Sequence, residues 1–309
     1  MKILIMGTGG VGGYYGGLLA QQGRQVTFIA RGPHLDAIRS DGLKVKSVHG
    51  DFTIFPANAT QDPGEAGPAD LVLFCVKSYN TDEAARQIQP AVGPGTVVVS
   101  LQNGIDAAER IGNLVGMEHV VGGVTWLSAA VEAPGVIRQV SQFRRIVLGE
   151  LAGSYSRRVD SISEAFKNTG VTVETSEDIW KVLWTKLVFI TAVSSLGSLT
   201  RLPMGDYRSV PEARNLLFRI MKEVEAVARA QDISLDTDVV EKWLAFIDGS
   251  APQIKPSMQV DVEAGRRTEL ESMIGVVSRK GHEQGVPTPV IDFVYAALLP
   301  VEQKARSRQ

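Results

Sequence analysis

Residues 2–30, KILIMGTGGVGGYYGGLLAQQGRQVTFIA, contain two short apolar runs on either side of a glycine-rich segment. The runs KILIM and QVTFIA are rich in aliphatic and β-branched residues, which is typical of buried parallel strands. The segment between them, residues 11–23, has the composition of a helix that ends at Gly23. A strand, a helix and a second strand in this order form a βαβ unit, so this stretch predicts the start of a parallel sheet.

The same alternation continues through the first half of the chain. Further apolar runs cover residues 70–76, 96–102 and 119–127, and later ones cover 136–140, 145–150 and 171–175, with a helix expected near 158–168. Strands that alternate with helices are typical of a doubly wound sheet. We therefore predict an α/β protein in which residues 1–174 form a Rossmann-like domain.

The second half of the chain shows helical periodicity. Ser176 is followed by two acidic residues, which is typical of a helix N-cap, and apolar residues recur at helical spacing from Trp180 to Ile190. Further helices are predicted after Pro211, over residues 236–248 and 269–284, and after Pro289. Residues 175–309 are expected to form an all-helical second domain, whose apolar helices are compatible with a homodimer.

The amino-acid composition indicates which kinds of ligand or partner the protein binds. The chain has 309 residues and a formal net charge of −2, so no overall positive field attracts it to nucleic acid or to an anionic membrane. Its one cysteine, Cys75, cannot form an internal disulfide, which fits a reducing compartment such as the cytoplasm. The four histidines lack metal-ligand spacing, and no uncharged apolar run reaches the roughly 18 residues that span a bilayer. We expect a small-molecule partner, with no metal ion and no membrane.

A G-x-G-x-x-G motif lies between the first strand and the first helix. In dinucleotide-binding proteins the first glycine permits a tight turn, the second lets the backbone approach a pyrophosphate, and the third lets the helix pack closely on the strand. The helix N-terminus then points unpaired N–H groups at the phosphates. A glycine-rich turn without a ligand is the alternative. The residues expected to border the cofactor are Gly7, Thr8, Gly9, Gly10, Val11 and Gly12.

The end of the second strand bears on which dinucleotide binds. An NAD-binding protein places Asp or Glu about 20 residues beyond the loop to hold the ribose 2′-hydroxyl. Here the strand ends in FIAR, so this position holds Arg31. A guanidinium matches a 2′-phosphate in charge and geometry, which favours NADPH over NADH. An ordinary surface arginine is the alternative.

Two further strands end in polar residues. Lys77 follows the strand LVLFCV, and Asn103 follows VVVSLQ. Ligands of open α/β sheets bind outside the carboxyl ends of the strands, so both side chains are candidates for the site. Because Gly104 follows Asn103, simple turn chemistry also explains that asparagine.

Lys186 lies near the start of an apolar stretch, WTKLVFITAVSSL, at residues 184–196. In one interpretation its stem covers apolar surface while its ammonium reaches water. In the other, its helix lines the cleft between the domains, and the ammonium donates a proton to a carbonyl oxygen as hydride reaches the carbon. Partial desolvation would lower its pKa towards the working pH.

A lysine in such a cleft needs a counter-charge, and the segment RRTELESMIG contains one. Thr268 and Glu271 have the spacing of a capping box, which places Glu269 in the first turn of a helix. A first-turn acid that only complements the helix dipole is the alternative.

The ordered set of motifs resembles one family. GTGGVG at the N-terminus, CVKS, LQNG, PG at 134–135, WTKL, PSMQVD and RRTELE span nearly the whole chain, and this order is similar to that of ketopantoate reductases (2-dehydropantoate 2-reductases). The resemblance implies a Rossmann domain followed by a helical domain. It also implies that NADPH reduces the ketone of 2-dehydropantoate to pantoate for pantothenate and coenzyme A synthesis.

The resemblance also implies a role for each matching residue. Lys186 would be the proton donor, and Asn103 would contact both cofactor and substrate. Glu269 would hold the nicotinamide ribose side of the site and orient the reactants. The remaining implied contacts are Ser257 with the substrate, and Lys77 and Ser128 with the cofactor.

The sequence departs from the family's pattern around the catalytic lysine. Family members carry Asn four and eight residues after it, and another polar residue just before a later glycine, whereas here these positions hold Ile190, Ser194 and Met204. Ser194 stays a candidate for binding the substrate. Lost amides can change discrimination by orders of magnitude, so a more apolar 2-oxo acid is an alternative substrate. A non-catalytic NADP-binding sensor is an alternative from another class.

Overall fold

The structure is a computed structural model that describes residues 1–308; residue 309, the last of the predicted second domain, lies outside it. The chain forms two compact units. The first consists of Met1–Gln102 and Ala107–Ile179, and the second of Asn103–Asp106 together with the chain from Trp180 onward. The sequence places a single boundary between residues 174 and 175. In the structure the chain leaves the first unit after Gln102, returns at Ala107 and leaves again after Ile179.

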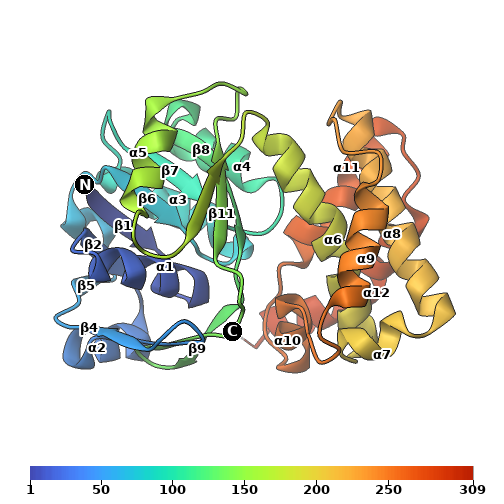
Figure 1. Cartoon of the computed structure of the whole chain (residues 1–309), viewed down its shortest axis with the longest axis horizontal. Helices are drawn as coiled ribbons and strands as arrows, with labels where there is room; N and C mark the ends of the chain where they lie inside the picture. Colours follow the sequence, from blue (N-terminus) through green and yellow to red (C-terminus); the bar gives the residue numbers. More distant parts are fainter. Residues whose placement is uncertain (309) are drawn as a thin grey trace. The chain divides into compact units, whose positions relative to one another are not determined.

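An eight-stranded sheet organises the first unit, with strand order β12-β11-β8-β7-β6-β1-β2-β5 (Figure 1). Neighbouring strands are parallel except for the antiparallel pair β8 and β11. The strands are β1 Lys2–Met6, β2 Gln25–Ile29, β5 Ala59–Thr60, β6 Leu71–Phe74, β7 Val97–Ser100, β8 Val120–Trp126, β11 Arg145–Gly149 and β12 Thr172–Thr175. The predicted Rossmann-like α/β architecture is confirmed.

Helices cover both faces of this sheet because both faces of its strands are apolar. On β1, Ile3 and Ile5 pack with α1 and α5, whereas Leu4 and Met6 pack with α3 and α4. Such residues alternate along a strand, so each face receives every second side chain. The helices of this unit are α1 Gly10–Gln21, α2 Gly32–Asp41, α3 Thr81–Ile88, α4 Ala107–Val115 and α5 Arg157–Ala165.

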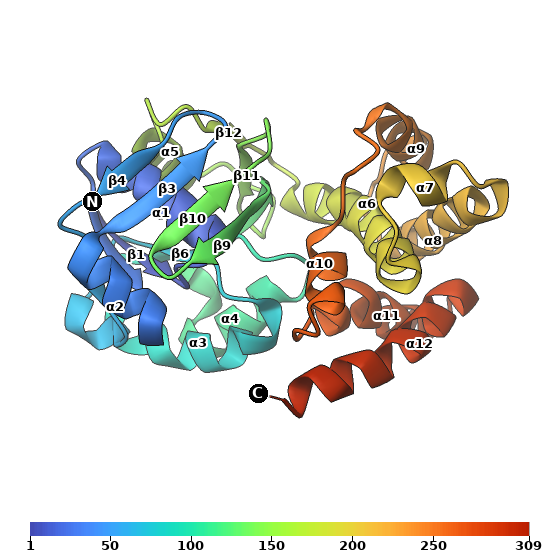
Figure 2. The ribbon, with the colours of Figure 1, turned by 90° about the horizontal axis from the view of Figure 1, so that it is seen from below.

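A second, four-stranded sheet has the order β4-β3-β10-β9 and packs on α1, which also contacts the large sheet (Figure 2). Its strands are β3 Leu43–Ser47, β4 Phe52–Ile54, β9 Ala129–Ala133 and β10 Val136–Gln139. The run at 136–140 was expected to be a strand, and it is the third strand of this small sheet. The other three strands of this sheet were not predicted, because most of their residues are exposed or partly exposed.

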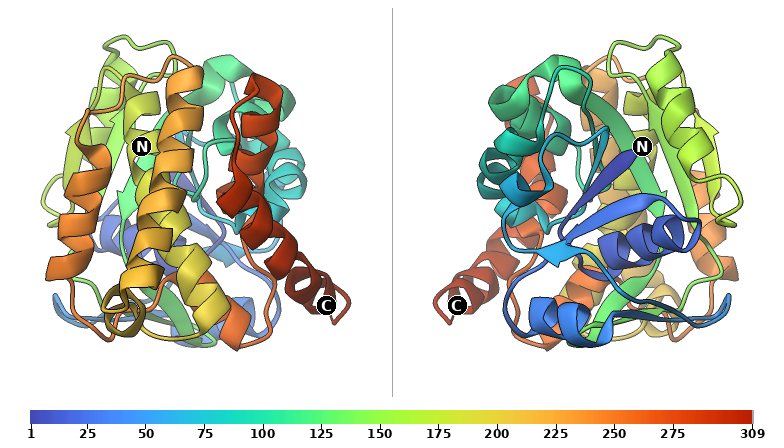
Figure 3. Two further views of the ribbon diagram at one scale, coloured as in Figure 1. Left: turned by 90° about the vertical axis from the view of Figure 1, so that its right-hand side faces the viewer. Right: turned by 90° about the vertical axis from the view of Figure 1, so that its left-hand side faces the viewer.

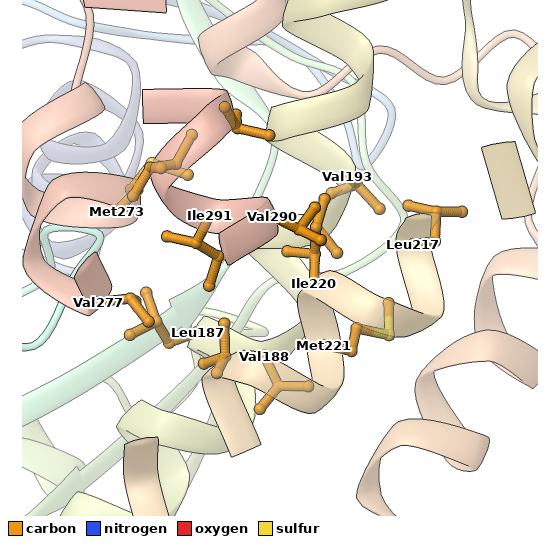
Figure 4. Packing of buried hydrophobic residues seen from close by; sticks show 14 of the residues in the cluster. Leu187, Val188, Val193, Leu217, Ile220, Met221, Met273, Val277, Val290 and Ile291 are labelled. Atoms are coloured by element: carbon orange, nitrogen blue, oxygen red, sulfur yellow. The ribbon is translucent and has the colours of Figure 1, made fainter. Parts of the chain in front are cut away.

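The second unit is all-helical, as predicted (Figure 3). Its helices are α6 Ile179–Thr200, whose first residue belongs to the first unit, α7 Met204–Arg208, α8 Pro211–Ala230, α9 Val239–Gly249, α10 Ser257–Glu263, η5 Glu271–Gly275, α11 Val276–Gln284 and α12 Pro289–Arg306. Side chains from α6, α8, α11 and α12 form its apolar core, including Leu187, Ile220, Val277 and Ile291 (Figure 4).

Helix α6 is central to this core. It is long and apolar enough to cross a membrane, but 61% of its apolar window is buried inside the protein, as is usual for a core helix. The helix begins at Ile179, later than expected from Ser176. The Ser176 hydroxyl instead accepts a hydrogen bond from the Asp178 N–H at 3.1 Å, so it closes the turn that precedes the helix.

Candidate active site

The glycine loop between β1 and α1 has the close contacts that the motif requires. Gly7 has φ +97°, and a Cβ there would lie 2.9 Å from the Val76 backbone nitrogen. A Cβ on Gly12 would lie 2.2 Å from the Gly7 carbonyl oxygen. A Cβ on Gly9 would meet no heavy atom of the described residues within 4 Å. Gly7 and Gly12 are thus required by the fold itself, while the space beside Gly9 is free for a ligand.

Thr8 and Gly10 connect the glycine loop to neighbouring strands. Thr8 is buried, and its hydroxyl and its N–H both donate to the Ile29 carbonyl at 2.9 Å, which ties the loop to the end of β2. Gly10 packs on β9, where a Cβ would lie 2.1 Å from the Ala129 carbonyl oxygen. Val11 is partly buried in the first turn of α1.

His34 is a further support that the sequence did not indicate. Its Nδ1 accepts a hydrogen bond from the Gly135 N–H at 3.0 Å, so Nε2 carries the proton and donates to the Thr8 carbonyl at 2.8 Å. The histidine therefore links the glycine loop to the turn between β9 and β10. Nothing in the local sequence of α2 signals this contact, since both partners are far away along the chain.

Arg31 follows β2, as the strand pattern predicted, and it precedes α2, a helix that was not predicted. Its side chain is 55% exposed, and its guanidinium donates to Glu83 Oε1 at 3.0 Å and to Gln87 Oε1 at 2.9 Å, both on α3. Glu83 is therefore a second charged group at the position expected to meet a 2′-phosphate.

Lys77 and Ser128 occupy different surroundings in the first unit. Lys77 follows β6 and is partly buried, and its carbonyl accepts a hydrogen bond from the Asn80 N–H at 2.8 Å. Ser128 lies in the exposed link between β8 and β9, where its N–H donates to Ser141 Oγ at 2.9 Å.

The helical unit brings together three residues that are far apart in the sequence. Lys186, in the second turn of α6, donates from Nζ to Asn103 Oδ1 at 2.8 Å. Asn103 Nδ2 in turn donates to Glu269 Oε2 at 3.4 Å. Asn103 follows β7 in the chain but belongs to the helical unit, so all three side chains are held within one compact body. The predicted counter-charge of Lys186 is therefore part of the same network.

Two opposing effects set the charge of Lys186. Burial disfavours the ammonium and lowers its pKa to about 8, while the Glu269 carboxylate acts in the other direction. Glu269 itself is only 6% exposed. The result is a cation that is mostly protonated at neutral pH and can release its proton to a nearby oxygen.

The segment that carries Glu269 differs from the prediction. The expected capping box is wrong, because the Thr268 N–H is bound by Glu302 of α12 at 2.8 Å, while Glu271 pairs with Arg279 at 2.8 Å. Glu269 lies directly before the helix, and its carbonyl accepts the Met273 N–H at 3.1 Å.

The Asn103 turn has a steric requirement of its own. Gly104 has φ +100°, and a Cβ there would lie 2.5 Å from the Ser272 carbonyl oxygen. The glycine thus lets residues 103–106 pack against the start of the helix that follows Glu269. Turn chemistry and a place in the site, which were alternatives for Asn103, are compatible.

The two serines expected to bind substrate also belong to the helical unit. Ser194 is fully buried on α6, and its hydroxyl has no hydrogen-bond partner within residues 1–308. Ser257 is exposed at the first position of α10. Ile190 is partly buried, and Met204 is 2% exposed within the apolar core. The hydrogen bonds that join Lys186, Asn103 and Glu269 include neither serine.

In the described part of the chain, no group of three or more His, Cys, Asp or Glu side chains is placed to hold a metal ion.

Both parts of the chain match one family of known proteins. The family model described as "Ketopantoate reductase PanE/ApbA" matches residues 3–153. The model described as "Ketopantoate reductase PanE/ApbA C terminal" matches residues 178–302.

Individual proteins are similar to this chain over almost its whole length. A 2-dehydropantoate 2-reductase of Mesorhizobium japonicum is 30% identical over 317 residues, which cover 96% of this chain and 96% of that protein. The uncharacterised oxidoreductase YkpB of Bacillus subtilis is 29% identical over 298 residues, which cover 96% and 98%. Among solved structures, a PanE/ApbA family ketopantoate reductase from Ralstonia eutropha JMP134 has a TM-score of 0.91 and 33% identity, with 99% of this chain and 100% of that chain covered.

Proposed function

Since the chain belongs to the ketopantoate reductase family and is an oxidoreductase, we propose that it reduces the ketone of 2-dehydropantoate to the alcohol of pantoate with NADPH. The observation that carries the proposal is the hydrogen-bonded set of Lys186, Asn103 and Glu269 in the helical unit. It combines a cation of lowered pKa with an amide and a carboxylate, which suits proton transfer to a carbonyl oxygen.

In the proposed mechanism the residues of the helical unit handle the proton. NADPH, when bound, supplies the hydride that reaches the carbonyl carbon. The Lys186 ammonium gives one proton to the carbonyl oxygen, so that hydride and proton together convert C=O to CH–OH. Asn103 Oδ1 accepts a hydrogen bond from Nζ at 2.8 Å and thereby holds the ammonium in one orientation. Glu269 favours the protonated form of the lysine.

Several features of the first unit favour the binding of a dinucleotide. The space beside Gly9 and the tight contacts at Gly7 and Gly12 fit the approach of a pyrophosphate to the N-terminus of α1. Arg31 supports a 2′-phosphate, and therefore NADPH, by its charge and its place after β2. Lys77 and Ser128 are proposed as further cofactor contacts, and Ser257 as a substrate contact. Ser194 is fully buried on α6, so we do not propose it as a substrate contact.

A steady-state panel of 2-oxo acids, measured with NADPH and with NADH, tests the proposal. It should contain 2-dehydropantoate, smaller unbranched 2-oxo acids and 2-oxo acids with branched or aromatic side chains. We expect the highest kcat/KM for 2-dehydropantoate with NADPH. No detectable rate on that acid, alongside turnover of another, would reject it as the substrate.

A reductase of a more apolar 2-oxo acid is the second candidate. It is favoured by Ile190 and Met204 at positions where the family carries polar side chains, and by Ser194, whose hydroxyl is enclosed in the protein. Fewer donors near the substrate weaken discrimination in favour of a hydroxylated acid. This candidate predicts a higher kcat/KM for a branched or aromatic 2-oxo acid in the same panel.

A further inference from the structure

Glu302 of α12 is a buried carboxylate with several partners. It is 1% exposed, and its Oε2 accepts the Thr268 N–H and the Thr268 hydroxyl, both at 2.8 Å. Its Oε1 accepts Arg306 Nε at 2.9 Å and lies 3.6 Å from Arg267 Nε. Two donors from one residue and two guanidinium groups thus surround one carboxylate.

Such a group is costly to bury unless its partners are in place. A buried carboxylate that loses its partners is strongly destabilising, and a buried N–H left without an acceptor is also unfavourable. Because breaking the two hydrogen bonds between Thr268 and Glu302 would carry both penalties, Glu302 holds Thr268 firmly in place. Helix α12 is itself packed in the apolar core through Ile291 (Figure 4). Val294 and Leu298 of the same helix also belong to that core, so the helix that carries Glu302 is firmly held.

The anchored residue is the immediate neighbour of Glu269. On one side of Glu269, Thr268 is bound to Glu302. On the other side the helix begins, and the carbonyl of Glu269 accepts the Met273 N–H at 3.1 Å. With its backbone held on both sides, the Glu269 side chain is directed towards Asn103 Nδ2, 3.4 Å away.

We propose that Glu302 is a positioning residue of the reductase site, which holds Thr268 so that the Glu269 carboxylate faces Asn103 and Lys186. The inference rests on the proposed function of that site. Nothing in the local sequence of α12 signals the role, because Glu302 reaches Thr268 from a different helix.

The role has a consequence for the neighbouring lysine. The Glu269 carboxylate raises the pKa of Lys186 against the effect of burial. If Glu269 moves away, Lys186 loses its proton at lower pH, and the alkaline fall of the reduction rate shifts to lower pH. The charged groups that face Glu302 are Arg267 and Arg306, and Arg306 also lies 3.7 Å from Glu271.

The test compares Glu302→Gln with Glu225→Gln in the full-length protein. Glu225 is a matched control, because it is a buried carboxylate of the same helical unit that pairs with Arg229 at 2.6 Å and with Lys222 at 2.5 Å. Both changes should lower Tm. We expect Glu302→Gln alone to lower kcat, by roughly tenfold to a hundredfold, with a smaller change in KM, and to shift the alkaline limb of the kcat profile to lower pH.

A milder variant covers the case in which Glu302→Gln does not fold. Thr268→Val removes the hydroxyl donor but keeps the N–H bond to Glu302. We expect it to shift the alkaline limb in the same direction by a smaller amount. An alkaline limb that stays in place in both variants, with losses that follow Tm as in Glu225→Gln, would overturn the proposal.

Titration of the Lys186 side chain by NMR separates this inference from the proposed function. A lower titration midpoint in the Glu302→Gln or Thr268→Val protein supports the positioning role even if no 2-oxo acid is reduced. An unchanged midpoint in a protein that does reduce a 2-oxo acid rejects the positioning role and leaves the function intact. An unchanged midpoint without turnover rejects both.

Discussion

Burial and the nearby Glu269 carboxylate have opposite effects on the pKa of the Lys186 ammonium group. Burial is the larger effect and lowers the pKa to about 8. Because a proton donor must be protonated, we expect the rate of ketone reduction to be constant at lower pH and to fall about tenfold per pH unit above the pKa of Lys186. The pH dependence of kcat checks this. A rate that stays level up to pH 10 would contradict the assignment of Lys186 as the donor.

Removal of the ammonium tests the same assignment directly. Lys186→Ala should lower kcat by about 10²- to 10⁴-fold, the usual contribution of a general acid, with little change in the Kd of NADPH. Lys181→Ala is the control, since Lys181 lies on the same helix and pairs with Asp236 at 2.7 Å. If the wild-type protein reduces a 2-oxo acid and Lys186→Ala abolishes this, the non-catalytic sensor is excluded.

At Arg31 the partner on α3 matters as much as the arginine. Glu83 lies 3.0 Å from the guanidinium and would repel a 2′-phosphate. We expect Glu83→Gln to tighten NADPH binding several-fold and to leave NADH binding unchanged, while Arg31→Asp weakens NADPH far more than NADH. Calorimetric titration of both cofactors measures these effects. Equal changes for the two cofactors would show that Arg31 does not bind a 2′-phosphate.

Single residues of the two units differ in how far the sequence alone indicates them. Arg31 and Lys186 could be named as candidates, because one stands at a strand end and the other is a charge in an apolar stretch. Glu83, His34 and Glu302 were missed, because each acts on a residue at least 26 positions away through a contact that only the folded chain creates.

At the scale of elements, two glycines of one loop have different requirements. A Cβ on Gly12 would lie 2.2 Å from the Gly7 carbonyl oxygen, so Gly12→Ala should separate α1 from β1 and lower Tm. A Cβ on Gly9 meets nothing of the described residues within 4 Å, so Gly9→Ala should keep Tm and lose dinucleotide binding. Thermal unfolding and NADPH titration of both variants distinguish the two roles. Unchanged NADPH affinity in Gly9→Ala would contradict the proposed path of the pyrophosphate.

Strands with a continuous apolar run were predictable from the sequence, and strands without one were not. The strands β1, β2, β6, β7 and β8 are buried on both faces, and a continuous apolar run identifies such strands without tertiary information. The capping box failed for a different reason. Its spacing is correct, but Glu302 supplies a carboxylate from another helix and takes the place of Glu271.

Each of the two units has its own apolar core. The spacing of apolar residues changes between the two halves of the chain, from strand-like runs to a helical period, and the fold class follows from this change. The place of residues 103–106 does not follow from it. Ile105 is buried in the core of the helical unit, although the strand before it and the helix after it belong to the first unit. Tertiary packing decides to which unit these four residues belong, and the local amino-acid sequence does not indicate it.

The place of Asn103–Asp106 in the helical unit limits how related genes can recombine. A hybrid gene joined at residue 180 would combine the amide of one parent with the ammonium and carboxylate of the other. Exchange of substrate preference between two relatives needs a double crossover that carries these four residues along. Libraries of chimeras with a single junction should accordingly be poorer in active members than libraries that transplant both segments together.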